Sequence, residues 1–388
     1  MRATLVISSL ARGGAERVMC MLASAWAEQG KEITLLTISH PHEAAYPIHP
    51  AVKVQHLGLA GVAKSPVHAI LLNIRRIRGL RRAIRNSQPD IVVSFMDAVN
   101  VLTVLATRLL NVPTVICEHI DPTFYDIGPI WNRLRRFVYP FADELICLTP
   151  STLSRFQAMI KIKGRVIPDL IAAPEPENQV RHKQETDKRV IVGMGRLVPQ
   201  KGFDLLLDAF ARIFQRHPQW SVEIIGGGPL KQELEKRAED LKISGKVHFA
   251  GEISNPFPAL SQADLFVFSS RFEGFGLALC EAMACGLPVV SFDCASGPGD
   301  IVRHGVDGIL VPPQDVEALA TAMDRLMSDV AERERLASRA PEVLVRFSRD
   351  RILTLWQQLF DDLTFAPGRR VPMSPVDQAD SPIRNDSR

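Results

Sequence analysis

Short runs rich in β-branched and other apolar residues recur along this chain, and patterns typical of helices separate most of them. One helical pattern, from Gly14 to Gln29, stops at Gly30, a residue favoured just beyond a helix C-terminus. Such alternation predicts parallel sheets covered by helices on both faces, so the expected fold class is α/β. The expected strands are Thr4–Ser8, Glu32–Ile38, Asp90–Ser94, Thr114–Cys117, Glu144–Leu148, Arg189–Gly193, Ser221–Ile225, Lys246–Phe249, Leu265–Phe268 and Pro288–Ser291.

The alternation is interrupted once, between residues 169 and 188. This stretch contains two prolines and a polar run without apolar periodicity, which is typical of a linker. We therefore predict two α/β domains, residues 1–168 and 189–345, joined by a linker over 169–188. A C-terminal helix over 346–366 is expected to pack back on the first domain. The polar remainder, 367–388, is expected to be disordered.

Composition narrows the class of protein. The chain has 388 residues, of which 46% are hydrophobic and 23% charged, as in ordinary globular proteins. No uncharged apolar run approaches the roughly 18–20 residues needed to span a membrane. The apolar run after Met1-Arg2 is too short for a signal peptide. Because the six cysteines show no C-x-x-C spacing, neither a zinc site nor a disulfide framework is indicated, and a reducing, cytoplasmic location is expected.

The net charge of +3 conceals an asymmetry between the two halves. Residues 1–165 carry 20 Lys and Arg against 11 Asp and Glu, whereas the rest of the chain carries 26 against 32. An excess of this kind indicates that the first half meets an anionic partner.

Much of this excess lies in Ala69–Gln88, where apolar residues recur every three or four positions among arginines and no acidic residue intervenes. The apolar positions are Ile70, Ile74, Ile77, Leu80 and Ile84; the basic positions are Arg75, Arg76, Arg78, Arg81, Arg82 and Arg85. A basic amphipathic helix of this kind is typical of contact with an anionic membrane surface, at the cytoplasmic face in this case, or with a lipid diphosphate. The alternative is a helix packed on the sheet with a solvated basic face. Nucleic acid is not favoured, because no aromatic residues interleave the arginines.

The richest concentration of chemistry lies between Asp264 and Val290, which is expected to form a strand, a loop, a helix and a second strand. Gly274 and Gly276 permit a tight turn, and a helix starting near Gly276 would present free N–H groups to a phosphate. Glu273 and Glu281 lie eight positions apart, and carboxylates accept hydrogen bonds from sugar hydroxyls. The alternative is a simple turn with Glu281 on a solvated helix face.

A second candidate segment, Gly193–Gly202, follows an expected strand at the end where ligands bind in open α/β sheets. Arg196 and Lys201 supply two cations suited to a diphosphate, although either could be surface charge on a turn. The segment lacks the G-x-x-x-x-G-K-[ST] pattern of a P-loop, and its G-x-G is too short for a dinucleotide fingerprint.

Two further segments follow strands of the first half. In Ser8–Arg17, Gly13 and Gly14 allow the backbone to approach a ligand. In Glu118–Asp121, His119 could donate a hydrogen bond to a hydroxyl, although a single histidine is more often structural.

Together these segments resemble the family 4 glycosyltransferases, which have the GT-B fold. The resemblance covers residues 189–313 and, more loosely, 1–165. The motifs that carry it are Gly195-Arg-Leu-Val-Pro-Gln-Lys-Gly202, Gly226-Gly-Gly-Pro229, the Glu273/Glu281 pair within Glu-Gly-Phe-Gly-Leu, Asp307-Gly-Ile-Leu-Val-Pro312 and Gly13-Gly-Ala-Glu-Arg-Val18. It implies two Rossmann-like, doubly wound domains that face a central cleft, the first binding the acceptor and the second a nucleotide sugar.

The resemblance also implies roles for individual residues. Glu281 would hold the ribose of the donor, Glu273 the hydroxyls of the transferred sugar, and the segment from Phe249 to Ile253 the base. The implied catalytic residues are His119, Glu273, Arg196 and Lys201. The implied donor-binding residues are Gly14, Arg196, Lys201, Gly251, Glu273, Phe275, Gly276, Leu277 and Glu281. The loop Gly297-Pro-Gly-Asp-Ile301 is similar to one that helps to recognise the donor in a subgroup of the family.

The implied reaction transfers a sugar with retention of configuration, and UDP is the nucleotide that the family favours. The acceptor would be lipid-linked or a growing polysaccharide of the cell envelope. No metal is expected: no D-x-D occurs in the sequence, so Arg196, Lys201 and a helix N-terminus would take the place of a metal at the leaving diphosphate. Because no covalent nucleophile is apparent, our hypothesis is front-face attack, with the acceptor proton passing to the leaving phosphate oxygen.

Three other classes of protein stay open. A nucleotide-sugar epimerase or hydrolase shares the two-domain architecture, but the Glu273/Glu281 pair argues against it. A nicotinamide-dependent oxidoreductase would need a G-x-G-x-x-G fingerprint after a strand, which the sequence lacks in that context. A silent sugar-binding module would not need both Arg196 and Lys201 beside the glutamates.

Overall fold

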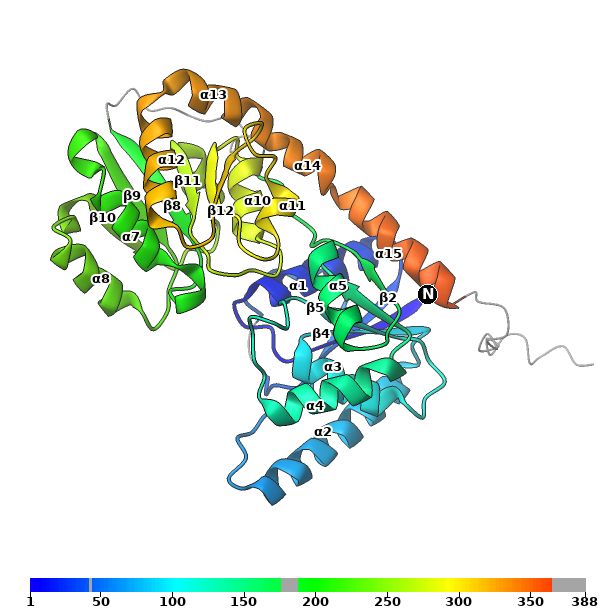
Figure 1. Cartoon of the computed structure of the whole chain (residues 1–388). Coiled ribbons are helices and arrows are strands. Elements are labelled where there is room, and N and C mark those ends of the chain that lie inside the picture. The colour runs from blue at the N-terminus through cyan, green and yellow to red at the C-terminus, as the bar shows by residue number, and fades with distance from the viewer. Residues whose placement is uncertain (42–43, 176–187, 365–388) are drawn as a thin grey trace, which may run out of the picture.

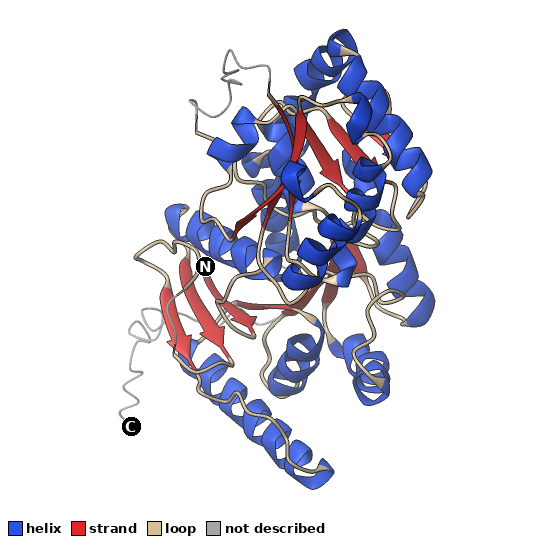
Figure 2. Cartoon of the chain, turned by 90° about the vertical axis from the view of Figure 1, so that its left-hand side faces the viewer, coloured by secondary structure: helices blue, strands red, loops and turns tan. Residues whose placement is uncertain are grey.

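The computed structural model describes residues 1–41, 44–175 and 188–364, which form two parallel β-sheets flanked by helices. Figures 1 and 2 show one sheet in each domain, with helices on both faces. Most of the expected linker (176–187) and the expected disordered tail (367–388) lie outside the described residues.

The N-terminal sheet has seven parallel strands in the order β3-β2-β1-β4-β5-β6-β7. Its central strands are buried along their whole length, which explains why their sequences read as continuous apolar runs. The strands are β1 (Arg2–Ile7), β2 (Glu32–Thr37), β3 (Lys53–His56), β4 (Ile91–Phe95), β5 (Thr114–Glu118), β6 (Glu144–Cys147) and β7 (Gly164–Val166). The helices are α1 (Gly14–Glu28), α2 (Pro66–Ser87), α3 (Asp97–Thr107), α4 (Pro129–Val138), the 3₁₀-helix η1 (Tyr139–Phe141) and α5 (Pro150–Met159).

The C-terminal sheet has six parallel strands in the order β10-β9-β8-β11-β12-β13. The strands are β8 (Arg189–Met194), β9 (Trp220–Ile225), β10 (Val247–Gly251), β11 (Leu265–Phe268), β12 (Val289–Phe292) and β13 (Ile309–Val311). The α-helices are α7 (Phe203–Ala211), α8 (Lys231–Asp240), α9 (Phe257–Gln262), α10 (Leu277–Ala284), α11 (Pro298–Ile301), α12 (Val316–Ser328), α13 (Val330–Arg339), α14 (Val343–Arg346) and α15 (Arg349–Thr364). Short 3₁₀-helices are η2 (Pro199–Lys201), η3 (Phe214–Arg216), η4 (Ser244–Lys246) and η5 (Ala340–Glu342).

The α/β prediction is confirmed, and all ten expected strands are present within two residues of their expected ends. Both sheets reverse their winding beside their first strand, at β1/β4 and at β8/β11. In doubly wound sheets, ligands bind beyond the carboxyl ends of the strands at this switch point. The segments Ser8–Arg17, Gly193–Gly202 and Asp264–Val290 all leave their sheets at a switch point.

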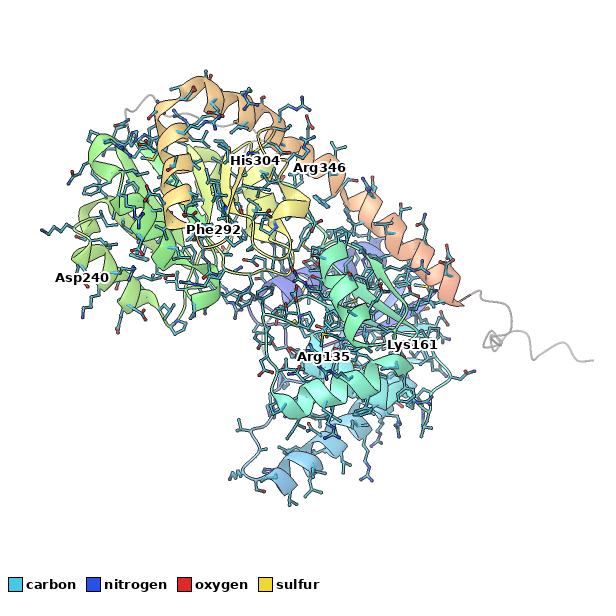
Figure 3. All side chains as sticks on the ribbon, viewed as in Figure 1. Arg135, Lys161, Asp240, Phe292, His304 and Arg346 are labelled. Atoms are coloured by element: carbon cyan, nitrogen blue, oxygen red, sulfur yellow. The ribbon has the colours of Figure 1, made fainter. Side chains whose placement is uncertain are left out.

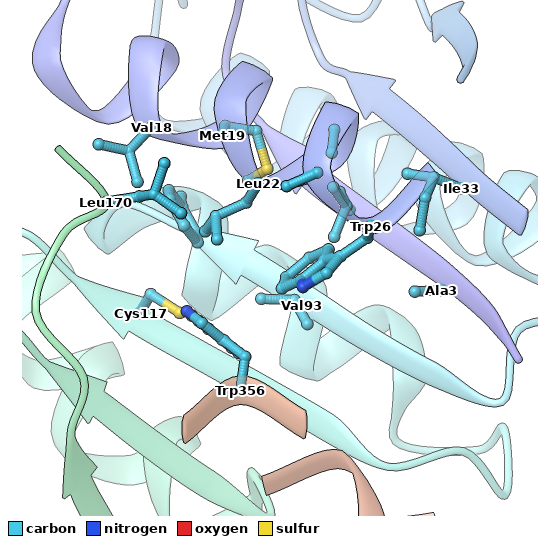
Figure 4. Packing of buried hydrophobic residues seen from close by; sticks show 14 of the residues in the cluster. Ala3, Val18, Met19, Leu22, Trp26, Ile33, Val93, Cys117, Leu170 and Trp356 are labelled. Carbon is cyan, nitrogen blue, oxygen red and sulfur yellow. The ribbon is translucent and has the colours of Figure 1, made fainter. Parts of the chain in front are cut away.

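The last helix, α15, joins the hydrophobic core of the N-terminal domain (Figure 1). Its Trp356 meets Trp26 of α1 edge-on, with ring centroids 5.4 Å apart, and Phe360 packs 5.0 Å from the same indole. Figure 4 shows Trp26 and Trp356 over strands of the N-terminal sheet, near Val93 and Cys117. At the far end of α15, Asp362 pairs with Arg165 at 2.8 Å.

The chain therefore crosses between the domains twice, once before β8 and once before α15. Where the two crossing segments meet lies a mainly apolar cavity of about 630 Å³, lined in part by Met21, Leu170, Ile171, Leu344 and Phe347.

The basic segment forms the longest described helix of the N-terminal domain, α2, but only its C-terminal half packs on the protein. Leu80 and Ile84 are buried, as the packed-helix alternative predicts, whereas Ile70 and Ile74 are exposed. The difference is one of length: α2 has 22 residues, about 33 Å, and its neighbour α3 has 11, about 16 Å. The first turns of α2 therefore overhang the domain.

Candidate active site

The β8 and β11 loops of the C-terminal domain converge at the switch point. In the β8 loop, Lys201 donates a hydrogen bond from Nζ to Oε1 of Glu273, 2.6 Å away in the β11 loop. Ser270 donates to the same oxygen, also at 2.6 Å. The Glu273 carboxylate is buried, and these two donors fix its orientation. Arg196 lies in the same β8 loop and is exposed.

Glycines permit the close packing of these loops. A Cβ atom at Gly226, the first residue of the Gly-Gly-Gly-Pro motif, would lie 1.9 Å from the carbonyl oxygen of Gly195. Only glycine fits at this approach, and its φ of +145° also disfavours an L side chain.

Helix α10 follows the β11 loop and carries Glu281. It begins after Gly276, whose φ of +120° again requires glycine, and no acidic residue occupies its first turn. Its N-terminal N–H groups and positive dipole end therefore suit an anion. Glu281 is buried rather than solvated, and it forms an ion pair with Arg17 of α1 in the other domain. Burial raises the pKa of Glu281, and Arg17 opposes that rise.

The N-terminal domain supplies His119 at the carboxyl end of β5. The His119 side chain is buried, with Nδ1 3.6 Å from Oδ1 of Asp169, and its Nε2 has no hydrogen-bond partner among the described residues. The Phe95 ring lies 4.4 Å from the imidazole. A Cβ atom at Gly274 would lie 1.6 Å from the His119 carbonyl oxygen, so the backbones of the two domains touch at this point.

Contacts across the domain boundary surround the site. Arg12 pairs with Glu252 at 2.8 Å, and Ser296 donates a hydrogen bond to Asp121 at 3.0 Å. The Phe124 and Phe272 rings stack with centroids 5.9 Å apart. These contacts hold the loops of both domains against one another.

The remaining donor-binding residues implied by the resemblance differ in which of their atoms a ligand could reach. Gly14 faces Leu277 at the start of α10, where an added Cβ would lie 3.7 Å from the leucine side chain. Gly251 ends β10 with φ of +74°. Phe275 is buried in the core, with its ring edge-on to Phe347 at 5.2 Å, so only its backbone is available to a ligand. The structure thus pairs Lys201 with Glu273 and sets Gly274, the residue after Glu273, against the backbone of His119, whereas Arg196 is exposed in the β8 loop.

Sequence reasoning assigned no role to three charged residues of this region. Arg17 lies in the Gly13–Val18 motif, one turn after the glycine pair, and its place in that motif could have indicated a role at the site. Asp169 fell in the expected linker. Asp121, which is fully buried and pairs with Arg155, followed His119 by two positions. The partners of all three are distant in sequence, so no local pattern identifies them.

Within the described residues, no group of three or more His, Cys, Asp or Glu side chains is arranged to hold a metal ion. In the same part of the chain, no helix combines the length and the apolar character that crossing a bilayer requires. The six cysteines are buried free thiols.

Two family models together match nearly all of the described chain. Residues 12–171 match the model described as Glycosyltransferase Family 4, and residues 174–343 match Glycosyl transferases group 1. The chain belongs to the family 4 glycosyltransferases. It is therefore an enzyme that transfers sugars, as the motifs predicted.

This glycosyltransferase is similar to several curated proteins. It is 30% identical over 351 residues to the lipopolysaccharide core biosynthesis glycosyltransferase LpsE of Rhizobium meliloti, covering 89% of this chain and 95% of LpsE. It is also 27% identical to a Campylobacter jejuni α-1,4-N-acetyl-D-galactosaminyltransferase whose name refers to a diphosphoundecaprenol-linked substrate. That match covers 94% of this chain and 99% of the Campylobacter protein. A 37% match over 287 residues to the exopolysaccharide phosphotransferase SCO2592 of Streptomyces coelicolor spans 73% of this chain but only 30% of that longer protein.

Solved structures show that the glycosyltransferase has the GT-B fold. Sucrose-phosphate synthase from Thermosynechococcus elongatus superimposes with a TM-score of 0.81 at 20% identity, over 94% of this chain and 100% of that one. HepE from Anabaena, in complex with UDP-glucose, superimposes with a TM-score of 0.73 at 20% identity and the same coverage.

Proposed function

We propose that this glycosyltransferase transfers a sugar from a UDP-sugar to a lipid-linked or polysaccharide acceptor of the cell envelope, with retention of configuration. The C-terminal domain binds the donor and the N-terminal domain the acceptor. The observation that carries the proposal is the convergence of Lys201, Glu273 and the start of α10 at one switch point, directly against His119 of the other domain.

In this proposal the diphosphate binds at the start of α10. The free N–H groups of Gly276 and Leu277 would receive phosphate oxygens, with the helix dipole adding positive potential. Lys201 has three donors, of which one is directed to Glu273, so its ammonium group can also bind phosphate. Arg196 supplies the second cation from the exposed side of the loop. The arrangement neutralises the leaving group with side chains and backbone dipoles.

Glu273 and His119 would hold the transferred sugar. Both known donors to Glu273 bind Oε1, which leaves Oε2 to accept hydrogen bonds from sugar hydroxyls. His119 has a buried Nε2 without a described partner, and a sugar hydroxyl would satisfy it. Glu281 would accept hydrogen bonds from the ribose through the oxygen that does not pair with Arg17.

The proposed chemistry is a front-face displacement. The bond from the anomeric carbon to the phosphate oxygen breaks, the acceptor oxygen bonds to the same face of that carbon, and the acceptor proton passes to the leaving phosphate oxygen. Charge develops on the phosphate, where loss of one preorganised donor is expected to reduce the rate about 10²–10³-fold. Closure of the two domains over the donor would exclude bulk water, which would limit hydrolysis of the donor.

Similar proteins support the choice of substrates. HepE was solved with UDP-glucose, and the names of two relatives refer to lipopolysaccharide core and to a diphosphoundecaprenol-linked glycan. In α2, Arg76 and Arg81 hydrogen-bond backbone carbonyls of the protein itself. The other four arginines, Arg75, Arg78, Arg82 and Arg85, are exposed and would contact anionic lipid headgroups or the acceptor diphosphate.

The test is a thermal-shift screen of UDP- and GDP-sugars against the wild-type enzyme and Glu281→Gln, followed by product analysis with and without a polyprenyl-diphosphate acceptor. We expect a UDP-sugar to stabilise the wild type by mass action and the variant less. Sugar transfer should require the acceptor. Epimerised or hydrolysed donor as the main product without acceptor would contradict the proposal.

A further inference from the structure

A row of large apolar side chains on α4 faces solvent. The exposed fractions are 73% for Ile130, 36% for Leu134 and 65% for Phe137, and 53% for Phe141 in η1, which continues the helix. Positions spaced by four, three and four residues lie on one face of a helix. We call these four residues the α4 stripe.

The rest of α4 separates into a packed face and a basic flank. Val138 and Arg135 are buried, and Arg135 lies 5.4 Å from the ring centroid of Phe156 in α5 (Figure 3). Arg133 and Arg136 are exposed, and α4 contains no acidic residue. The helix is therefore already anchored by its own packed face, so the α4 stripe is not needed to hold α4 in place.

The overhanging turns of α2 present the same combination of exposed apolar and basic side chains. Val67, Ile70 and Leu71 are 66%, 61% and 59% exposed, and Arg75 and Arg78 follow them. The two helices flank the same part of the N-terminal core, because Trp131 of α4 and Ile77 of α2 pack against the same buried cluster. Figure 1 places both in the part of the N-terminal domain away from the C-terminal domain.

Charge decides which partner fits this surface. A symmetric contact between two copies would bring Arg133 and Arg136 of each copy close to the same arginines of the other, with no acidic residue on α4 or α2 to compensate. An anionic bilayer offers hydrocarbon for the α4 stripe and phosphate for the flanking guanidinium groups. The cation at Arg108, 4.3 Å over the Phe141 ring, adds to this field.

We propose that the α4 stripe inserts into the interface of an anionic bilayer, so that the enzyme is held by apolar insertion at α4 as well as by the charges of α2. The proposal deepens the proposed function and rests on it for the lipid-linked acceptor. Helix α4 begins ten residues after His119 on the same connection from β5. Insertion at α4 would therefore limit how far His119 can lie from the membrane surface.

The experiment is sedimentation of the full-length enzyme with vesicles of phosphatidylcholine alone or with phosphatidylglycerol, at low and high salt. The test variant is Leu134→Glu/Phe137→Glu. The matched control is Val330→Glu/Val345→Glu, at two exposed apolar positions of the C-terminal domain (49% and 73%). A third variant, Arg75→Ala/Arg78→Ala, removes charge from α2 only.

We expect the α4 variant to lose at least 10-fold in partitioning at both salt concentrations, and the control to bind as wild type. The α2 variant should lose binding chiefly at low salt, where electrostatic attraction operates. The proposal would be overturned if the α4 variant bound vesicles as well as the wild type does. It would also be overturned if light scattering showed the wild type to be a dimer and the α4 variant to be a monomer. The affinity for UDP, measured in parallel without vesicles, should be equal in the wild type and all variants. If the wild type did not bind UDP, the proposed function would be contradicted, but the result on membrane binding would still hold.

Discussion

The ion pair between Arg17 and Glu281 gives the sharpest test of the site. Arg17→Ala removes the guanidinium group that pairs with a carboxylate only 3% exposed. Burial already raises the pKa of Glu281, and Arg17 is the group that counteracts it. We therefore expect the substitution to raise this pKa further and to increase the protonated fraction of Glu281.

The expected loss of nucleotide affinity depends on whether Glu281 stays charged or takes up a proton after Arg17 is removed. Removing one partner of a buried ion pair costs about 3–5 kcal/mol when the other stays charged. Glu281 can escape that cost by taking up a proton, at about 1.4 kcal/mol for each unit of pKa. A neutral carboxyl accepts weaker hydrogen bonds from ribose hydroxyls. We expect nucleotide affinity to fall roughly 10- to 100-fold, equivalent to about 1.4–2.7 kcal/mol, and Arg17→Lys to restore most of it.

The assay is calorimetric titration with UDP between pH 6 and 9. In Arg17→Ala the affinity should recover as the pH rises, because Glu281 then ionises, whereas the wild type should change little. Arg12→Ala is the control, since Arg12 also bridges the domains but its pair with Glu252 is half exposed on both sides and is worth about 1 kcal/mol or less. Tighter UDP binding by Arg17→Ala would refute the reasoning, because Arg17 would then compete with the ribose for Glu281.

Three further predictions concern closure, pH and the last helix. In Gly274→Ala, the new Cβ would lie 1.6 Å from the His119 carbonyl oxygen, so the two domains could not approach as closely. We expect kcat/KM to fall at least roughly 10-fold and the radius of gyration in X-ray scattering to increase. Unchanged kinetics would contradict this prediction. Burial raises the pKa of Glu118 from 4.5 to about 7, so the folded protein retains a proton that the unfolded chain releases. The free energy of unfolding should fall by up to about 3 kcal/mol as the pH rises through this range, and Glu118→Gln should flatten that dependence in urea titrations. Trp356→Ala should reduce the free energy of unfolding of the N-terminal domain by about 3–5 kcal/mol, and a protease should then cleave α15 faster.

Local sequence pattern was sufficient for most of the fold. The central strands are buried on both faces, so their apolar runs are long and conspicuous. Strands β3, β7 and β13 were not predicted, and β7 and β13 have only three residues each, fewer than any strand that was predicted. In addition, β3 lies at a sheet edge and is mostly exposed, which removes the apolar signal.

Some of the candidate site residues could be named from the sequence for the same reason. Glycine pairs and carboxylates at fixed spacing are local, so Glu273, Gly276 and Glu281 could be singled out. The sequence did not show that Lys201 binds Glu273 or that Arg17 binds Glu281, because these contacts depend on how two strands and two domains pack. The sequence also left open whether Ile70 and Ile74 of α2 pack on the sheet or face a membrane, since the helical period does not show that the neighbouring helix α3 is too short to cover them.

The return of α15 to the first domain has a consequence for biosynthesis. The N-terminal core is complete only when residues 352–363 have been made, although its other members all precede residue 171. A ribosome translates the entire C-terminal domain in the interval, and during that time the indole of Trp26 lacks the side chains of Trp356 and Phe360 that cover it. Until α15 is made, the aromatic residues of this core have no cover in a nascent chain, and exposed apolar surface of this kind is what holding chaperones bind.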